Sequence, residues 1–139
     1  MSKVDTQERL GAFLSIKIMK TNLSPYELNQ LLPRMIKGFS NRIGERHAIK
    51  STEIITVLKA EGYNITDTQI RTIVRHIRQN HLLPCLASSS SSGYWIENDP
   101  NKLRICITRL RSRAQEALAS ADALAQDYVK LTQTSATPS

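Results

Sequence analysis

The sequence has few of the residues that build membrane spans, metal sites or disulfide frameworks. No stretch of its 139 residues approaches the roughly 20 consecutive apolar residues that a membrane-spanning helix needs. Aromatic residues make up only 5% of the chain, so a core must be built mainly from Ile, Leu, Val and Ala. The first ten residues, MSKVDTQERL, contain no apolar block and do not look like a secretory signal. We therefore expect a cytoplasmic protein without a membrane partner.

Cysteine is equally scarce, and the pattern of reactive side chains does not indicate an enzyme. Cys85 and Cys106 have neither CxxC spacing nor a nearby histidine that would complete a zinc site, so we expect reduced, buried thiols. The sequence also shows no paired carboxylates, no Ser/His/Asp arrangement and no glycine-rich phosphate loop. We expect no catalytic residue, no metal and no cofactor.

Positive charge is abundant but unevenly distributed. The formal net charge is +7 and the pI is about 9.7, which favours polyanionic partners, nucleic acid first and an anionic membrane second. Residues 41–99 carry seven Lys/Arg against six Asp/Glu, whereas residues 1–40 and 100–139 each carry six against three. If the central region contacts DNA, it must use individually positioned arginines, because its bulk charge is too small.

The first 40 residues form a predicted N-terminal helical segment. Apolar residues at helical spacing predict a helix over Val4–Lys20. A second helix is expected from Ser24, which suits the N-cap, with Pro25 as the first helical residue. Pro33 lies within its apolar pattern, and we expect it to kink the helix or end it early.

Two short helices are predicted in the centre of the chain. The first carries Ile54 and Leu58 on one side and ends at Gly62, a residue typical of helix C-termini. The second begins with a capping box formed by Thr66 and Gln69, and its apolar residues follow the i, i+3, i+4, i+7 pattern to about residue 80. Two short helices joined by a tight glycine-containing turn are typical of a helix-turn-helix.

A serine run, residues 88–92, follows this helix pair. It separates LLPCLA (82–87) from GYWIE (93–97), two short segments rich in strand formers. We interpret the serines as the tip of a β-hairpin within one domain, residues 41–99. A flexible linker between two domains is the alternative, because serine-rich composition alone would support it.

The last part of the chain, from Pro100, is predicted to form one long helix. Its apolar residues alternate spacings of four and three, which is a heptad pattern; they are Leu103, Ile107, Leu110, Ala114, Ala117, Ala121, Leu124, Tyr128 and Leu131. We expect a helix over residues 100–131 and a disordered tail over residues 132–139. The heptad surface either forms a homodimer, which we favour, or packs against the N-terminal helices of the same chain.

Residues 44–113 resemble the winged helix-turn-helix DNA-binding proteins, particularly small members carried by bacteriophages and prophages. The matching segments are HAIKSTEIITVLK, ITDTQIRTIVRHIRQNHLLPCLASS, GYWI and NDPNKLRICITRLRSR. The turn region AEGYNITD is longer than in the tightest versions and the tip has five serines, which puts the depth of groove entry in doubt. The resemblance implies a mainly α fold with a small β-hairpin wing, followed by the long C-terminal helix.

The candidate site is the polar face of the second central helix, together with the wing and the basic start of the last helix. We predict base contacts from Thr68, Arg71, Thr72 and Arg75. We predict contacts to the DNA backbone from Arg78, Gln79, Ser89, Ser90, Ser91, Arg109 and Arg111. A merely solvated helix face and a solvent-exposed loop are the alternatives for these residues.

The functional hypothesis is sequence-specific binding of double-stranded DNA, by a non-enzymatic regulator of transcription or replication in a phage or prophage setting. The alternative is a protein-interaction adaptor that uses the winged fold and the last helix without binding DNA.

Overall fold

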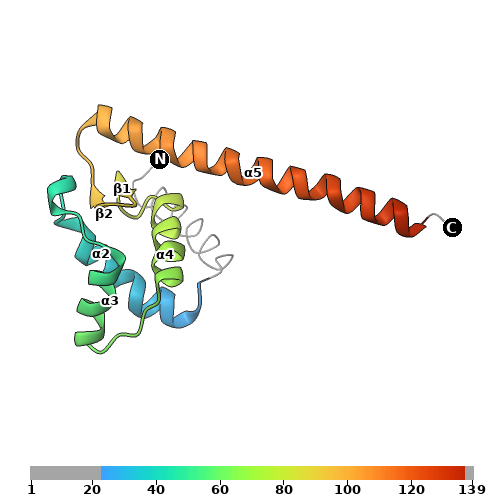
Figure 1. Cartoon of the computed structure of the whole chain (residues 1–139). Coiled ribbons are helices and arrows are strands. Elements are labelled where there is room, and N and C mark those ends of the chain that lie inside the picture. The colour runs from blue at the N-terminus through green and yellow to red at the C-terminus, as the bar shows by residue number, and fades with distance from the viewer. Residues whose placement is uncertain (1–22, 137–139) are drawn as a thin grey trace, which may run out of the picture. The chain divides into compact units, whose positions relative to one another are not determined.

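The computed structural model describes residues 23–136 and divides the chain into two units that meet between Asp99 and Pro100. The described chain is mainly helical, with a two-stranded antiparallel sheet and a long C-terminal helix, as predicted (Figure 1). The helix predicted over Val4–Lys20 lies outside the described residues. None of the helices in residues 23–136 combines the length and the apolar character that crossing a bilayer requires.

The first described helical stretch consists of the π-helix η1 (Glu27–Leu31) and the helix α2 (Leu32–Ser40). The predicted cap at its start is present, because the Ser24 hydroxyl accepts the Glu27 N–H at 3.1 Å and the Glu27 carboxylate accepts the Ser24 N–H at 2.8 Å. Pro33 does not end the helix. It lies inside a helical stretch that continues without a break to Ser40, and the irregularity is the π-helical turn just before it.

The two central helices are α3 (Ser51–Ala60) and α4 (Asp67–Gln79), which contact each other. The turn after α3 is closed by the Tyr63 N–H, which donates to the Leu58 carbonyl at 2.8 Å, while Gly62 takes a φ of +92°. This is the glycine termination that the sequence predicts.

The start of α4 has the predicted capping box. The Gln69 N–H donates to the Thr66 hydroxyl at 3.2 Å, and the Gln69 side-chain oxygen accepts the Thr66 N–H at 2.9 Å. The apolar side of the helix is buried as its periodicity predicts, with Ile70, Ile73, Val74 and Ile77 at 2% exposure or less. One face of α4 is therefore fixed in the core and the other is left to solvent.

The serine run is part of a hairpin, so the linker alternative is wrong. Strand β1 (Leu86–Ser89) pairs antiparallel with β2 (Gly93–Ile96) in a register that places Leu86 opposite Ile96 and Ser89 opposite Gly93. β1 begins four residues later than predicted and includes Ser88 and Ser89. The serines thus supply both the end of a strand and the turn.

β2 is also bonded on its other side, by the segment between α2 and α3. Ile49 and Tyr94 exchange two backbone hydrogen bonds of 2.9 Å, and Ile43 forms an isolated parallel bridge with Ile96. β2 is therefore the central strand of a small sheet whose third member is reduced to single bridges. This arrangement fixes the hairpin to the helices.

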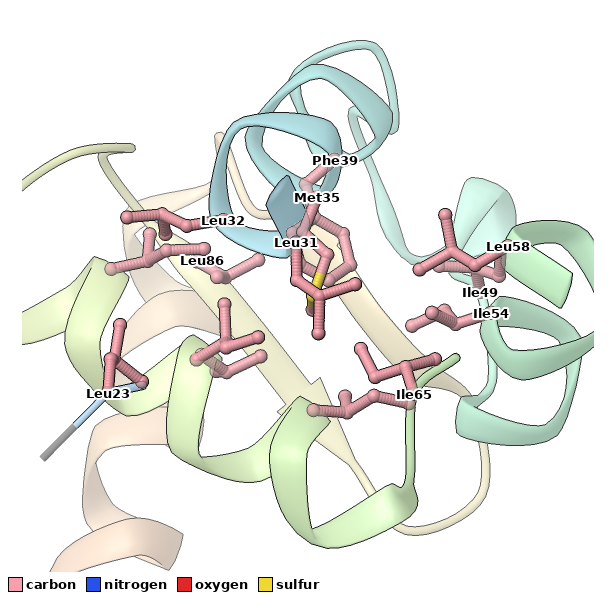
Figure 2. Packing of buried hydrophobic residues seen from close by; sticks show 14 residues of the cluster. Leu23, Leu31, Leu32, Met35, Phe39, Ile49, Ile54, Leu58, Ile65 and Leu86 are labelled. Atoms are coloured by element: carbon pink, nitrogen blue, oxygen red, sulfur yellow. The ribbon is translucent and has the colours of Figure 1, made fainter. Parts of the chain in front are cut away.

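The core of the first unit lies between α2, α3, α4 and the sheet (Figure 2). As predicted, Ile and Leu dominate it, with Met35 and Phe39 from α2 among them. On β2 the two aromatic residues point to different environments. Trp95 is buried, and its Nε1–H donates to the buried Glu97 carboxylate at 3.0 Å, while the Tyr94 ring lies 5.8 Å from the Phe39 ring between centroids. Trp95 is thus buried, but outside the cluster against which Tyr94 packs.

A surface ion pair joins α2 to the end of α3. The Arg34 guanidinium donates two hydrogen bonds of 2.7 Å to the two carboxylate oxygens of Glu61. This bidentate contact lowers the pKa of Glu61 below its usual value and raises the pKa of Arg34. It holds the start of the turn that leads into α4.

The second unit is the helix α5 (Pro100–Ala136), 37 residues long. It does not end at Leu131, so the tail predicted over residues 132–139 is wrong as far as Ala136. Both cysteines are free; Cys106 is buried as predicted, but Cys85 is exposed, because it lies in the turn before β1 with a φ of +62°.

Candidate nucleic-acid interface

The exposed face of α4 carries the residues predicted to contact bases. Thr68, Arg71 and Arg75 are exposed, and Thr72 is half-buried between them. Their spacing of three and four places them on one side of the helix, opposite the buried isoleucines. Gln79 extends the same exposed stripe by one turn. The structure therefore brings these five residues together on one surface.

Arg71 is held over the first turn of α4 by two weak contacts. Its Nη2 lies 3.5 Å from the Asp67 carboxylate and 3.4 Å from the Thr68 hydroxyl. Both charged side chains are more than half exposed, at 62% for Arg71 and 53% for Asp67. An exposed ion pair of this kind contributes less than about 1 kcal/mol, so a phosphate or a guanine edge would readily replace it.

Thr72 and Arg75 differ in how far their polar atoms are already used. The Thr72 hydroxyl donates to the Thr68 carbonyl at 3.0 Å, which leaves its methyl group and an oxygen lone pair for a partner. The Arg75 guanidinium makes no hydrogen bond or ion pair within residues 23–136 and is exposed. Arg75 is therefore the cation on this face with most donors available.

Arg78, a predicted backbone contact, is bonded to the hairpin. Its Nε–H donates to the Leu86 carbonyl at 2.8 Å, and its Nη2 donates to the Ser88 hydroxyl at 3.0 Å. The side chain is partly buried and joins the last turn of α4 to β1. A DNA phosphate would have to share the guanidinium with these two bonds. The sequence gives no direct signal for this contact, because it depends on where the hairpin packs.

His76 follows the exposed Arg75 on α4 but is itself only 6% exposed. Its Nδ1 lies 3.3 Å from the Asn80 amide nitrogen, which also donates to the His76 carbonyl at 2.9 Å. Burial lowers the pKa of His76 below the usual value of 6.5, because the charged form loses hydration. His76 is therefore part of the support of α4 and not of its exposed face.

This lowered pKa predicts an acid-dependent loss of stability. Between the usual value of 6.5 and the lower folded pKa, the unfolded chain binds a proton that the folded chain does not, so the free energy of unfolding falls as the pH falls through this window. Urea unfolding from about pH 7 to about pH 5 measures it. His76→Gln should reduce the fall, and the control His47→Gln, at an exposed residue, should not. Equal slopes in wild type and His76→Gln would contradict the assignment.

The tip of the hairpin is held by hydrogen bonds of its own serines. The Ser89 hydroxyl accepts the Ser92 N–H at 3.0 Å, and the Ser92 hydroxyl donates to the Glu45 carboxylate at 2.7 Å. Ser90 and Ser91 are exposed at the turn, whereas Ser89 is half-buried in β1. The predicted contacts Ser90 and Ser91 are thus presented to solvent from a tip that is tied back to the segment before α3. The Glu45 contact was not predicted.

Arg109 and Arg111, the remaining predicted backbone contacts, are exposed on α5. They belong to the second unit, so only the α4 and hairpin residues form a site within one unit.

The described residues contain no cluster of three or more His, Cys, Asp or Glu that could hold a metal ion. Comparisons with protein-family models, with curated proteins and with solved structures found no match.

Proposed function

We propose that the protein binds double-stranded DNA and recognises its sequence with α4, with the hairpin β1–β2 acting as the wing of a winged helix-turn-helix. The observation that carries the proposal is the two-sided character of α4. Its isoleucines are fixed in the core while its arginines and threonines are in solvent, beside a hairpin bonded to the same helix through Arg78. The order α2, Ile49 bridge, α3, α4, β1, β2 is compatible with a winged helix.

The chemistry of the exposed face suits the major groove of DNA. The groove is about 12 Å wide and admits an α-helix, and the N-terminal part of a recognition helix meets base edges. Arg71 and Arg75 would each bind guanine O6 and N7, and the Thr68 or Thr72 methyl group would pack on a thymine methyl. The exposed hydroxyls of Ser90 and Ser91 would contact the phosphate backbone.

The proposal is tested by fluorescence-anisotropy titration of the full chain against random duplexes and duplexes selected in vitro. Binding that is salt-sensitive and stronger for selected duplexes supports it. The absence of salt-sensitive binding at low ionic strength, with a folded chain, would end it and leave the adaptor function as the explanation of the exposed surfaces.

Arg71→Ala is expected to weaken binding to a selected duplex by about 1–3 kcal/mol and to relax the preference at one base position. The reason is the loss of a bidentate contact to one base pair. Affinities for a panel of single-base variants of the duplex measure the effect. The control is Lys37→Ala, which removes an exposed cation from α2. A uniform loss across the panel would show that Arg71 contacts only phosphate.

A second copy of the chain is the other proposed partner, bound through α5. Leu124, Tyr128 and Leu131 are 68%, 66% and 68% exposed, although they belong to a continuous heptad pattern. Large apolar side chains repeated along one helix at this exposure favour a partner helix.

A further inference from the structure

We infer that two copies of α5 pair in antiparallel orientation through residues 114–131, so that their DNA-binding units are attached at opposite ends of the pair. The pairing itself rests on the proposed homodimer, and its consequence for DNA rests on the proposed function. The exposed α5 surface is thus covered by α5 of a second copy, which runs in the opposite direction.

The heptad surface of α5, here called the seam, has small residues in its first half and large residues in its second half. Its first three positions in this range are Ala114, Ala117 and Ala121, and its last three are Leu124, Tyr128 and Leu131; all are exposed. A parallel pair would place each residue opposite itself. It would have three thin layers of alanine followed by three thick layers, and helices at a constant separation cannot pack both.

Antiparallel pairing makes every layer alike. With Ala121 opposite Leu124 of the second copy, Ala117 lies opposite Tyr128 and Ala114 opposite Leu131. Each of the six layers then contains one small and one large side chain, which is the arrangement that fills a constant gap. Beside the seam, Leu118 lies near Ala125 of the second copy, two residues away from the level position, so a large residue again has a small neighbour.

Charge favours the same direction. Residues 102–113 carry Lys102, Arg104, Arg109, Arg111 and Arg113 without one acid. A parallel pair would align these two basic segments side by side, where like charges repel. The antiparallel pair places them beyond opposite ends of the seam, and each remains open to a polyanion.

The register also sets a distance. At about 1.5 Å per residue, the two Pro100 residues lie about 68 Å apart along the axis of the pair. Helix-turn-helix dimers that read adjacent half-sites place them about 34 Å apart, one turn of DNA. The points at which the antiparallel dimer attaches its two units are therefore about twice as far apart as adjacent half-sites.

Disulfide trapping tests the orientation. In a Cys85→Ser, Cys106→Ala background, two single variants, Ala114→Cys and Leu131→Cys, are mixed in a glutathione redox buffer, one of them carrying a tag. The antiparallel pair predicts mainly the mixed disulfide, because like cysteines would lie about 26 Å apart, far beyond the Cα separation of about 4–7 Å that a disulfide allows. Mainly homotypic disulfides would overturn the orientation, and no disulfide with a monomeric chain would overturn the dimer.

A size-swap cycle tests the neighbouring layer, in which Ala117 lies opposite Tyr128, without cysteines. Ala117→Leu and Tyr128→Ala should each raise the dimer dissociation constant at least about tenfold, and the double variant should return within about threefold of wild type, because the small and large partners have only changed places. Additive losses in the double variant would overturn the antiparallel register.

Ala121→Glu is expected to abolish the dimer in sedimentation equilibrium, because it puts a charge in every central layer. The matched control is Ala119→Glu, the same substitution on the opposite side of α5, which should remain dimeric; both positions are exposed. If both variants had the same oligomeric state, the assignment of Ala121 to the seam would be wrong. DNA affinity of monomeric Ala121→Glu, measured by anisotropy on a single half-site, separates a failure of dimerisation from a failure of DNA binding.

Discussion

Gly93→Ala is expected to destabilise the first unit strongly, with a loss of about 4 kcal/mol or more in the free energy of unfolding. An added Cβ would lie 2.1 Å from the Ile49 carbonyl oxygen and 2.8 Å from the Lys50 Cα. Both are backbone atoms, so no side-chain rotation relieves the clash. The two Ile49–Tyr94 hydrogen bonds must open, and with them the attachment of the hairpin to the helices. Because domains are stable by only about 5–15 kcal/mol, this is a large share.

Circular dichroism and urea unfolding measure the effect, and Gly62→Ala is the matched control. The two glycines have similar backbone angles, with φ of +97° and +92°, but nothing lies within 4 Å of a Cβ at Gly62. Gly62→Ala should therefore cost only the conformational strain, about 1–2 kcal/mol. If Gly93→Ala were no more destabilising than Gly62→Ala, the close packing of the hairpin on residues 49 and 50 would be wrong.

Binding to DNA is expected to weaken steeply with salt. Each neutralised phosphate contributes about −0.9 to the slope of log affinity against log salt. With two to five cations engaged among Arg71, Arg75, Arg78, Arg109 and Arg111, the affinity should fall about 10- to 500-fold between about 50 and 200 mM salt. Because the charge of residues 41–99 is nearly balanced, we expect α5 to supply a large share of these contacts.

The double variant Arg109→Ala, Arg111→Ala should reduce the magnitude of this slope by about 2 and weaken all duplexes alike. Its control is Lys130→Ala, which removes an exposed cation from the far part of the same helix. Anisotropy titrations at four or five salt concentrations measure the slope. An unchanged slope in the double variant would show that the basic start of α5 does not contact DNA.

The elements that follow local rules were predictable from the sequence. The Thr66–Gln69 capping box, the glycine termination at Gly62 and the isoleucine periodicity of α4 each depend on residues within one or two turns. The strand boundaries that depend on residues distant in the sequence were not predictable. β1 begins at Leu86, where it can pair with Ile96. The third strand is reduced to the Ile49 bridge, which no local sequence pattern predicts.

The same distinction applies to the candidate site. Exposure of Thr68, Arg71 and Arg75 follows from helical periodicity, so the sequence predicts it. The environments of His76 and Arg78 do not follow, since both lie at the border between the apolar and polar faces. At such a border, tertiary packing decides which side chain is covered, and Arg78 is partly covered because it bonds to the hairpin.

The Arg78 bridge between α4 and the hairpin has a consequence for any ligand that touches both. Two bonds to one guanidinium couple the strand to the helix before a ligand arrives. Less motional freedom then remains to be lost when the complex forms, because this part of the surface is preorganised. Contacts at the serine tip and contacts along the helix should accordingly contribute to affinity as one cooperative unit, and their individual losses should not add.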